Sequence, residues 1–296
     1  MAFEISYPPI PIFHVGPLAF SLHGVFAALG FAAGAWLFLR LARDRHPAEQ
    51  LSSVLTWALV GSLLGARYLT IPAHMGDPTF TLRDALDPFG SFSILGGFAG
   101  GVLGGWVRIR MLRLPFLPLL DLAAPGMALG TVVGRLGDLA IVEHLGRATD
   151  FALGYAVKSG YDLAPQHDGL ECAVEQACGI YHHTALYDLV GAAVLLWVLL
   201  QLRDRWRKRY EGQLFAFWMF WYGYQRFLVD FTRIGGENAD RMGGPLTWSQ
   251  WAALAVGLGG MALIFWLEGR TSRIVPEGSR GRAARSSEAT GRSPAP

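Results

Sequence analysis

The 296-residue chain is too apolar and too sparsely charged for an average soluble globular protein. Hydrophobic residues make up 52% of it and charged residues only 16%. In soluble domains roughly a quarter of all residues are charged. The net charge of +2 gives no indication of nucleic-acid binding, and none is expected. The composition therefore predicts an all-α polytopic membrane protein and argues against a soluble enzyme.

The apolar residues fall into blocks of about the length that crosses a hydrocarbon core, roughly 20 residues. Charges, prolines or glycines separate each block from the next. We expect about seven transmembrane helices, within Leu18–Leu39, Leu51–Ile71, Phe92–Val107, Leu114–Val133, Thr184–Leu202, Gln213–Phe231 and Thr247–Leu267.

Basic residues alternate along the chain in a way that predicts orientation. Of the 25 Lys and Arg residues, 17 lie in four segments, 40–45, 108–113, 203–209 and 270–292. Because cytoplasmic loops carry the excess of Lys and Arg, seven crossings with the N-terminus outside place all four segments in the cytoplasm. No basic residue precedes Arg40, so the first block lacks the charged start of a cleaved signal peptide and is expected to be retained. We expect a multi-pass protein of a bacterial inner membrane.

This topology divides the chain into four parts: helices one to four in 1–133, a small extracytoplasmic cap in 134–183, helices five to seven in 184–269, and a basic cytoplasmic tail in 270–296. The tail is rich in Gly, Ser, Ala and Pro and is predicted to be disordered.

Cys172 and Cys178 fall in the cap, where disulfides persist. We expect a disulfide there ahead of two free thiols, and zinc well behind both; no metal or cofactor is predicted.

Glycines recur every four residues in the third block. One row is Gly96, Gly100 and Gly104, and the other is Gly97, Gly101 and Gly105. Glycines four apart share a helix face and let a neighbouring backbone approach closely, so tight helix packing is the favoured interpretation. Room for an acyl chain or headgroup is the alternative.

Ionisable residues lie in or beside the apolar blocks, where they are costly and often functional. On the predicted outer half they are the basic residues Arg67, Arg135, Arg226 and Arg233 and the acidic residues Asp138, Glu143, Asp188 and Asp230. Asp121 lies on the cytoplasmic half and is expected to be structural.

Two interpretations of this outer charge compete. Buried ion pairs fix helix register in many polytopic proteins, and Arg226 and Asp230 are spaced i, i+4 on one helix face. Alternatively, several arginines on one side suit a phosphate, which the guanidinium fork binds bidentately. A phospholipid headgroup is the corresponding ligand. His23, His182, His183 and Tyr222 add groups that transfer protons, although a lone histidine is more often a packing residue.

At this point the sequence resembles a known family. Gly134-Arg135-Leu136-Gly137-Asp138, followed by Glu143 and Gly146, is similar to the signature G-R-x-G-N-F-x-N-x-E of bacterial prolipoprotein diacylglyceryl transferases. Further segments resemble family motifs in the same order along nearly the whole chain: Ser93–Gly97 resembles S-F-H-G-G, His182–Asp188 resembles H-P-[ST]-x-L-Y-E, and Tyr222–Asp230 resembles Y-G-x-x-R with a following Glu. Seven helices, an outside N-terminus and a cap after helix four agree with that family's fold.

The chain departs from the family pattern at several motif positions. Leu95 stands where the family usually has a histidine, a proposed base, and His23 stands at a usual tyrosine. The remaining departures are Asp138 and Ile141 for two asparagines, His183 for a proline, and Asp188 and Asp230 for two glutamates.

The resemblance implies transfer of a diacylglyceryl group from phosphatidylglycerol to the lipobox cysteine of a prolipoprotein, leaving glycerol phosphate. The implied catalytic residues are Arg135, Glu143, Arg226, His182 and His23. The implied substrate-binding residues are Arg135, Arg226, Asp138, Tyr222, Gly146, Asp230, Arg67, Gly96 and Gly97. With leucine at 95, the base is left open among His23, His182, Glu143 and Asp138.

Three functions remain open, with the transferase first. The second is a homologue with a different lipid-transferase substrate, and the third is a non-catalytic membrane protein that binds or moves lipid. Expected partners are phosphatidylglycerol, prolipoprotein signal peptides and membrane lipids. Charges gathered on one side, rather than threading the bilayer, argue against an ion channel or a coupled transporter.

Overall fold

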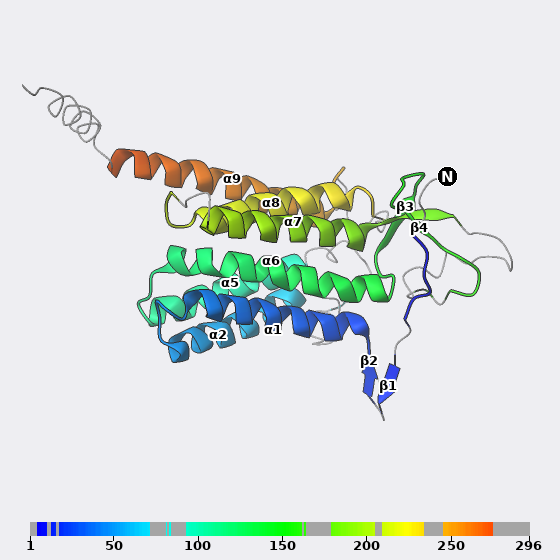
Figure 1. Cartoon of the computed structure of the whole chain (residues 1–296), viewed down its shortest axis with the longest axis horizontal. Helices are drawn as coiled ribbons and strands as arrows, with labels where there is room; N and C mark the ends of the chain where they lie inside the picture. The colour runs from blue at the N-terminus through cyan, green and yellow to red at the C-terminus, as the bar shows by residue number, and fades with distance from the viewer. Residues whose placement is uncertain are drawn as a thin grey trace, which may run out of the picture.

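The computed structural model describes residues 5–10, 13–15, 18–71, 81, 83, 93–161, 163, 179–204, 209–233 and 245–274. Seven helices lie within these residues: α1 (Leu22–Ala42), α2 (Ala48–Tyr68), α5 (Ile94–Met111), α6 (Phe116–Ala140), α7 (Thr184–Asp204), α8 (Gln213–Asp230) and α9 (Trp248–Ile274). They run side by side along the long axis of the molecule (Figure 1). Each of the seven predicted apolar blocks overlaps one of them over most of its length.

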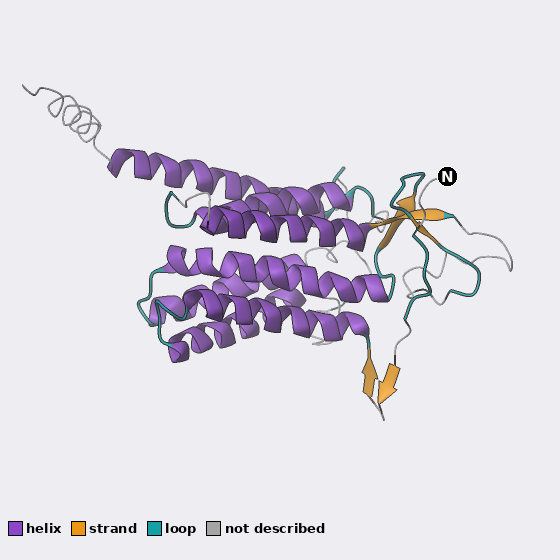
Figure 2. Ribbon diagram, in the orientation of Figure 1, coloured by secondary structure: helices purple, strands orange, loops and turns teal. Residues whose placement is uncertain are grey.

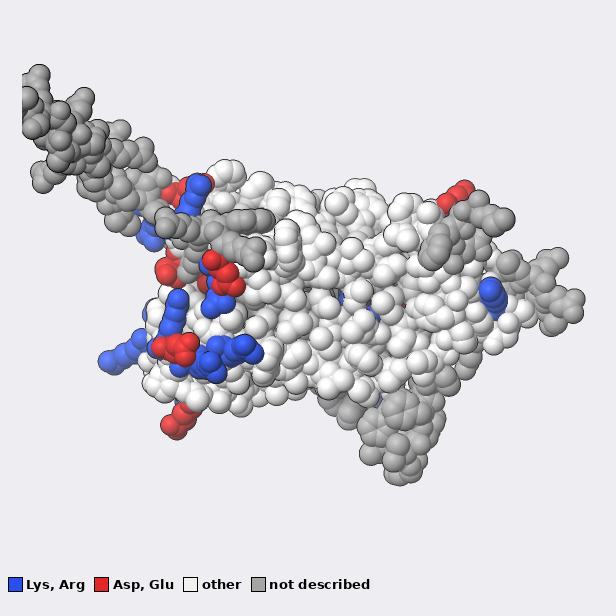
Figure 3. Space-filling model, in the orientation of Figure 1, with Lys and Arg blue, Asp and Glu red and all other residues white. Residues whose placement is uncertain are grey.

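The helical part has the surface of a membrane protein. Among the described residues, four helices are long and apolar enough to cross a bilayer: α1, α6, α7 and the part of α9 up to Arg270. Large apolar side chains are exposed on the helices, among them Trp36, Leu64, Trp197 and Phe265. A soluble protein rarely exposes so much apolar surface, whereas lipid covers it readily. Charged side chains gather at one end, where α1, α5 and α7 end, and the middle of the face in view is nearly free of them (Figure 3).

The fourth helix is longer than the sequence predicted. The predicted end was Val133, but α6 continues to Ala140 and includes Arg135 and Asp138. Glycines and charges follow Val133 and separate this block from the next in the sequence, yet a Cβ at Gly137 would overlap the side chain of Phe26, so that glycine lets α1 pack closely. The two charges lie inside the helix because they pair with each other at i, i+3. At the other end of the chain, α9 extends to Ile274, into the segment predicted to be a tail.

Glycines hold the helices together in pairs, as predicted for the third block. Cβ atoms at Gly96 and Gly100 of α5 would overlap backbone carbonyls of Gly65 and Gly61 on α2. The pair α1 and α6 has the same design, because a Cβ at Gly30 would come within 2.5 Å of the Gly130 carbonyl oxygen. Close backbone approach gives such helices extensive van der Waals contact without a hydrophobic driving force.

Asp121 of α6 has a structural role, as expected. Its carboxylate accepts hydrogen bonds from the backbone N–H groups of Gly212 (2.6 Å) and Phe215 (3.0 Å), at the start of α8. Gly212 adopts a left-handed conformation and offers no side-chain cap, so a carboxylate from another helix satisfies the free N–H groups. This contact fixes α8 against α6.

Short strands occupy the end of the bundle where α6 ends and α7 begins (Figure 2). Strands β3 (Leu145–Ala148), β5 (Ile180–His183) and β4 (Tyr155–Ala156) form an antiparallel sheet in that order. The N-terminal segment joins it through a bridge between Ile5 and Tyr155. A separate hairpin, β1 (Phe13–Val15) and β2 (Leu18–Phe20), precedes α1. Cys172, Cys178 and the tail beyond 274 lie outside the described residues.

Candidate functional site

Ionisable side chains from four helices and two loops meet at the sheet end of the bundle. We call them the charged cluster and define it as His23, Arg135, Asp138, Glu143, Asp188, Arg226, Asp230 and Arg233. Arg135, Asp138 and Asp188 are buried, with 6%, 2% and 5% of their surface exposed. The sequence placed these residues on one side of the membrane, and the structure connects them through ion pairs.

Asp138 joins α1 to Arg135. One oxygen of its carboxylate, Oδ1, lies 2.5 Å from Nδ1 of His23, and the other, Oδ2, lies 2.5 Å from Nη1 of Arg135. Because an ionised carboxylate only accepts hydrogen bonds, Nδ1 of His23 is the donor. The histidine ring is therefore oriented by a carboxylate that a guanidinium group holds from its other side.

Asp188 joins Arg135 to Arg226. Its Oδ2 atom lies 2.7 Å from Nη2 of Arg135 and 3.8 Å from Nη1 of Arg226. Two guanidinium groups from different helices, α6 and α8, thus face one carboxylate oxygen. This arrangement places two positive charges next to each other inside the protein.

The cluster continues from Arg226 toward the sheet. Asp230 accepts from Arg226 Nη2 at 3.1 Å, the i, i+4 pair expected from the sequence, and lies 4.0 Å from Arg233. Arg233 in turn bonds Nδ1 of His144 at 3.1 Å. Burial and the neighbouring Arg233 lower the pKa of His144 to about 3, so this histidine is neutral at pH 7.

A tight turn after α6 brings Glu143 back toward α1. The residues on either side, Val142 and His144, have left-handed conformations with φ of 53° and 64°. Such a conformation is costly for a β-branched residue, and the complete burial of Val142 helps to hold it. Glu143 Oε2 lies 3.1 Å from Nδ1 of His23. Burial alone would raise the pKa of the Glu143 carboxyl, but the nearby His23 holds it below its usual value.

Several buried polar atoms of the site have no hydrogen-bond partner among the described residues. They are Nε of Arg135, Nη1 of Arg226 and the hydroxyl of Tyr222. Buried polar groups nearly always have partners, so each unpaired one requires an explanation. All three are donors, and Tyr222 and Arg226 share a face of α8 at i, i+4. Donors of this kind fit an anion.

The remaining predicted site residues lie outside the charged cluster. They are Arg67, His182, Gly96, Gly97 and Gly146. Arg67 is buried near the end of α2 and is not part of the charged cluster. Nδ1 of His182 lies 3.0 Å from the Tyr187 hydroxyl, also outside the cluster. Gly96 and Gly97 face α2, with Gly97 next to Ser62, so packing accounts for both. A Cβ at Gly146 would overlap the carbonyl oxygen of Thr232, where strand β3 crosses the end of α8.

Sequence reasoning missed two contacts of the sheet end. The first is His144, which holds Arg233. The second is Tyr7, whose hydroxyl donates to the carbonyl of Leu139 at 2.7 Å and lies 2.9 Å from Nε2 of His183. Burial lowers the pKa of His183 to about 4 and keeps it neutral. The N-terminal segment carries no motif, so only the fold could reveal this partner.

One group in the described part of the chain has the composition of a metal site. The ligand atoms of His23, Asp138 and Glu143 lie within 4.8 Å of one another. However, Asp138 also pairs with the guanidinium group of Arg135, and that positive charge opposes a bound cation. We therefore interpret the three residues as an ion-pair network.

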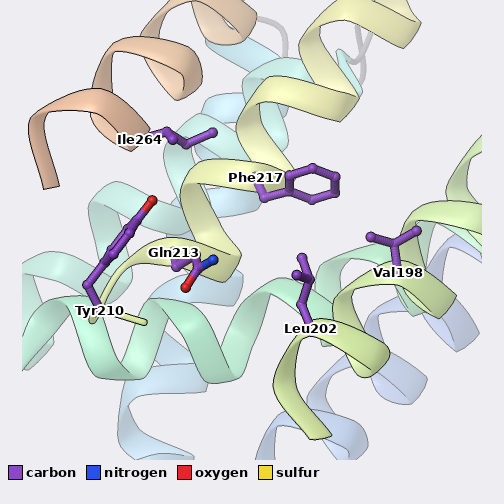
Figure 4. A pocket seen from close by; sticks show the side chains of 6 residues that line it. All are labelled: Val198, Leu202, Tyr210, Gln213, Phe217 and Ile264. Carbon is purple, nitrogen blue, oxygen red and sulfur yellow. The ribbon is translucent and has the colours of Figure 1, made fainter. Parts of the chain in front are cut away.

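A pocket at the opposite end of the bundle is no candidate for this chemistry (Figure 4). It measures about 220 Å³ and is lined by Val198, Leu202, Tyr210, Gln213, Phe217 and Ile264, none of which is charged. Phe217 and Arg226 are nine residues apart on α8, which separates them by about 13 Å along the helix axis. The pocket therefore does not reach the charged cluster.

Comparison with known proteins identifies the family. Residues 10–266 match the family model described as prolipoprotein diacylglyceryl transferase. Proteins named phosphatidylglycerol–prolipoprotein diacylglyceryl transferase are similar over nearly their whole length. The one from Pseudoalteromonas atlantica is 29% identical, with 94% of this chain and 98% of the relative aligned. Those from Cupriavidus pinatubonensis and Azotobacter vinelandii are 26% and 27% identical, covering 92% and 91% of this chain and 96% and 99% of the relatives. The chain therefore belongs to the prolipoprotein diacylglyceryl transferase family.

Proposed function

We propose that this protein transfers a diacylglyceryl group from phosphatidylglycerol to the cysteine thiol of prolipoproteins. The relatives are named for this reaction and align with almost the entire chain. The observation that carries the proposal is the pair of guanidinium groups, Arg135 and Arg226, that face one carboxylate oxygen and retain unpaired buried N–H groups.

The reaction needs positive charge where the phosphate departs. Arg135 and Arg226 supply two planar forks from different helices, and an unpaired hydroxyl of Tyr222 lies on the same face of α8 as Arg226. The guanidinium groups are already held in place by Asp138, Asp188 and Asp230. They therefore need little rearrangement when negative charge develops on the leaving phosphate. In this proposal Arg135 and Arg226 bind the phosphate, and the three acids position them.

The other candidate residues have supporting roles in this proposal. Gly146 lets strand β3 cross the end of α8 and so keeps His144 beside Arg233. Glu143 faces His23. His182, Arg67, Gly96 and Gly97 stay predictions from the family resemblance.

A complementation experiment tests the function. The gene should restore prolipoprotein processing in a bacterial strain depleted of its own transferase, whereas an Arg135→Ala variant of equal abundance should not. Arg43→Ala, an exposed arginine at the far end of α1, is the matched control and should complement fully. Normal abundance without processing would favour the alternatives, a homologue with another lipid-transferase substrate or a non-catalytic lipid-binding protein.

We further propose seven membrane crossings in the bacterial inner membrane, with the N-terminus and the strand-rich end outside. The four basic segments support this topology, because the helix ends that carry them lie at one end of the bundle (Figure 1). Reporter fusions placed after Arg45, Arg113 and Arg209 and in the tail should all report the cytoplasm. One strong extracytoplasmic signal among the four would refute the topology.

A further inference from the structure

We infer that His23 is the acid–base residue of this chain and that Asp138 positions it. The inference rests on the proposed transferase function and names the group that takes the proton of the acceptor thiol. The family's usual histidine is replaced by Leu95, which packs against the apolar cluster around Tyr222 and cannot accept a proton.

The geometry of His23 is that of an oriented base. Its Nδ1–H donates to Asp138 at 2.5 Å, which leaves Nε2 as the accepting nitrogen of the neutral ring. The side chain is 46% exposed, so an acceptor can approach from outside the bundle. A carboxylate on Nδ1 fixes the tautomer and stabilises the imidazolium ion that forms, as in other histidine–carboxylate pairs.

The alternative proton acceptors are less suitable. Asp138 uses both carboxylate oxygens, one for His23 and one for Arg135. His183 is buried and His144 is half-buried, and each uses one ring nitrogen, His144 for Arg233 and His183 for Tyr7. Glu143 is close to His23, but a carboxylate whose pKa lies below its usual value is a weak base.

The charges around His23 stabilise the imidazolium ion that forms when the ring takes a proton. Across from α1, the last turns of α6 present Asp138, with Arg135 behind it, and the following turn presents Glu143 and then His144. Two carboxylates next to the ring stabilise an imidazolium ion, and an imidazolium ion in turn stabilises a thiolate.

The chemical step balances with these groups. The cysteine thiol gives its proton to Nε2 of His23, and its sulfur attacks the glycerol carbon of the phospholipid. The carbon–sulfur bond forms as the carbon–oxygen bond to the phosphate breaks, and that electron pair leaves on the phosphate oxygen near Arg135. His23 then releases the proton to water, and the phosphate monoester leaves as the dianion.

The pH dependence of the rate tests this role. The purified protein is assayed with phosphatidylglycerol vesicles and a lipobox peptide between pH 6.5 and 9. His23→Gln should lower kcat about 10²- to 10⁴-fold at pH 7, the usual contribution of a general acid–base group, with little change in KM for the lipid. Its rate should then rise about tenfold per pH unit toward the ordinary thiol pKa of about 8.5, because the thiol ionises unaided. Wild-type protein should show a much flatter profile.

Further variants separate the role from folding. Asp138→Asn keeps an acceptor for Nδ1–H but removes the charge, so it should give an intermediate rate. His23→Tyr keeps a ring of similar polarity and should also be slow at pH 7, since a neutral phenol is a poor base. His46→Gln, in the turn after α1, is the matched control and should match wild type.

Each adverse result has a distinct meaning. Full activity of His23→Gln at pH 7, or equal slowing at every pH in a folded variant, would overturn the inference. Loss of wild-type activity in chelator, restored by zinc, would also overturn it, because His23 would then serve a metal. If wild-type protein makes no diacylglyceryl peptide at any pH, the proposed function itself fails.

Discussion

Replacing Arg135 or Arg226 with lysine should reduce diacylglyceryl transfer by about 10²- to 10³-fold, the range seen when one preorganised donor to a developing anion is lost. Lysine keeps the positive charge, but it cannot contact Asp188 and a phosphate at the same time with a planar fork. Steady-state rates with phosphatidylglycerol vesicles, at equal amounts of folded protein, measure the effect.

A purely structural role for Arg226 predicts a different pattern. In that case Arg226→Ala would only remove one cation from Asp230, which keeps Thr247 and Arg233, and the destabilisation would be no more than roughly 3–5 kcal/mol, the cost of a broken buried pair. Removing the acid as well, in Arg226→Ala/Asp230→Ala, would restore both stability and lipid binding. If the double variant is folded and still fails to bind phosphatidylglycerol, the arginine is a lipid ligand.

Asp188 makes the test stricter, because it is shared by the two arginines. Asp188→Asn keeps the shape but removes the negative charge between Arg135 and Arg226. If the arginines bind phosphate, affinity for an anionic headgroup should persist or rise, while stability falls. A loss of lipid binding with unchanged stability would contradict this account.

Much of the helical fold was predictable from the sequence because the bilayer imposes a simple rule on apolar length. Each predicted block overlaps a helix, and the glycine row that includes Gly96 and Gly100 packs as expected. The end of α6 was wrong because the block was ended at Val133, where glycines and charges follow. Only the neighbouring helix α1 shows that Gly137 is there to admit Phe26.

The membership of the charged cluster was predictable, but its connections were not. Costly charges beside apolar blocks identified the arginines and acids, and i, i+4 spacing identified Arg226 with Asp230. The sharing of Asp188 between α6 and α8, and of Asp138 between Arg135 and His23, depends on how helices distant in sequence pack. No local pattern encodes those contacts.

Substituting alanine for Gly100 should destabilise the protein severely, by about 3 kcal/mol or more, at or beyond the upper end of overpacking costs. Its Cβ would overlap the Gly61 carbonyl oxygen and come within 2.8 Å of the Gly65 Cα, so α2 and α5 would have to separate. Both obstacles are backbone atoms, which cannot rotate away as a side chain can. Thermal unfolding in detergent and the amount of protein in the membrane measure the cost.

Gly101, the next residue of α5, provides the matched control for the same substitution. A Cβ there would lie 3.5 Å from the Ala58 carbonyl oxygen and from the Ser62 Cβ, which is ordinary contact. Both substitutions remove the same helical entropy penalty of glycine, about 1 kcal/mol, so the difference between them isolates the steric cost. Equal melting temperatures for Gly100→Ala and Gly101→Ala would mean that α2 and α5 do not approach as closely as the backbone contacts at Gly61 and Gly65 require.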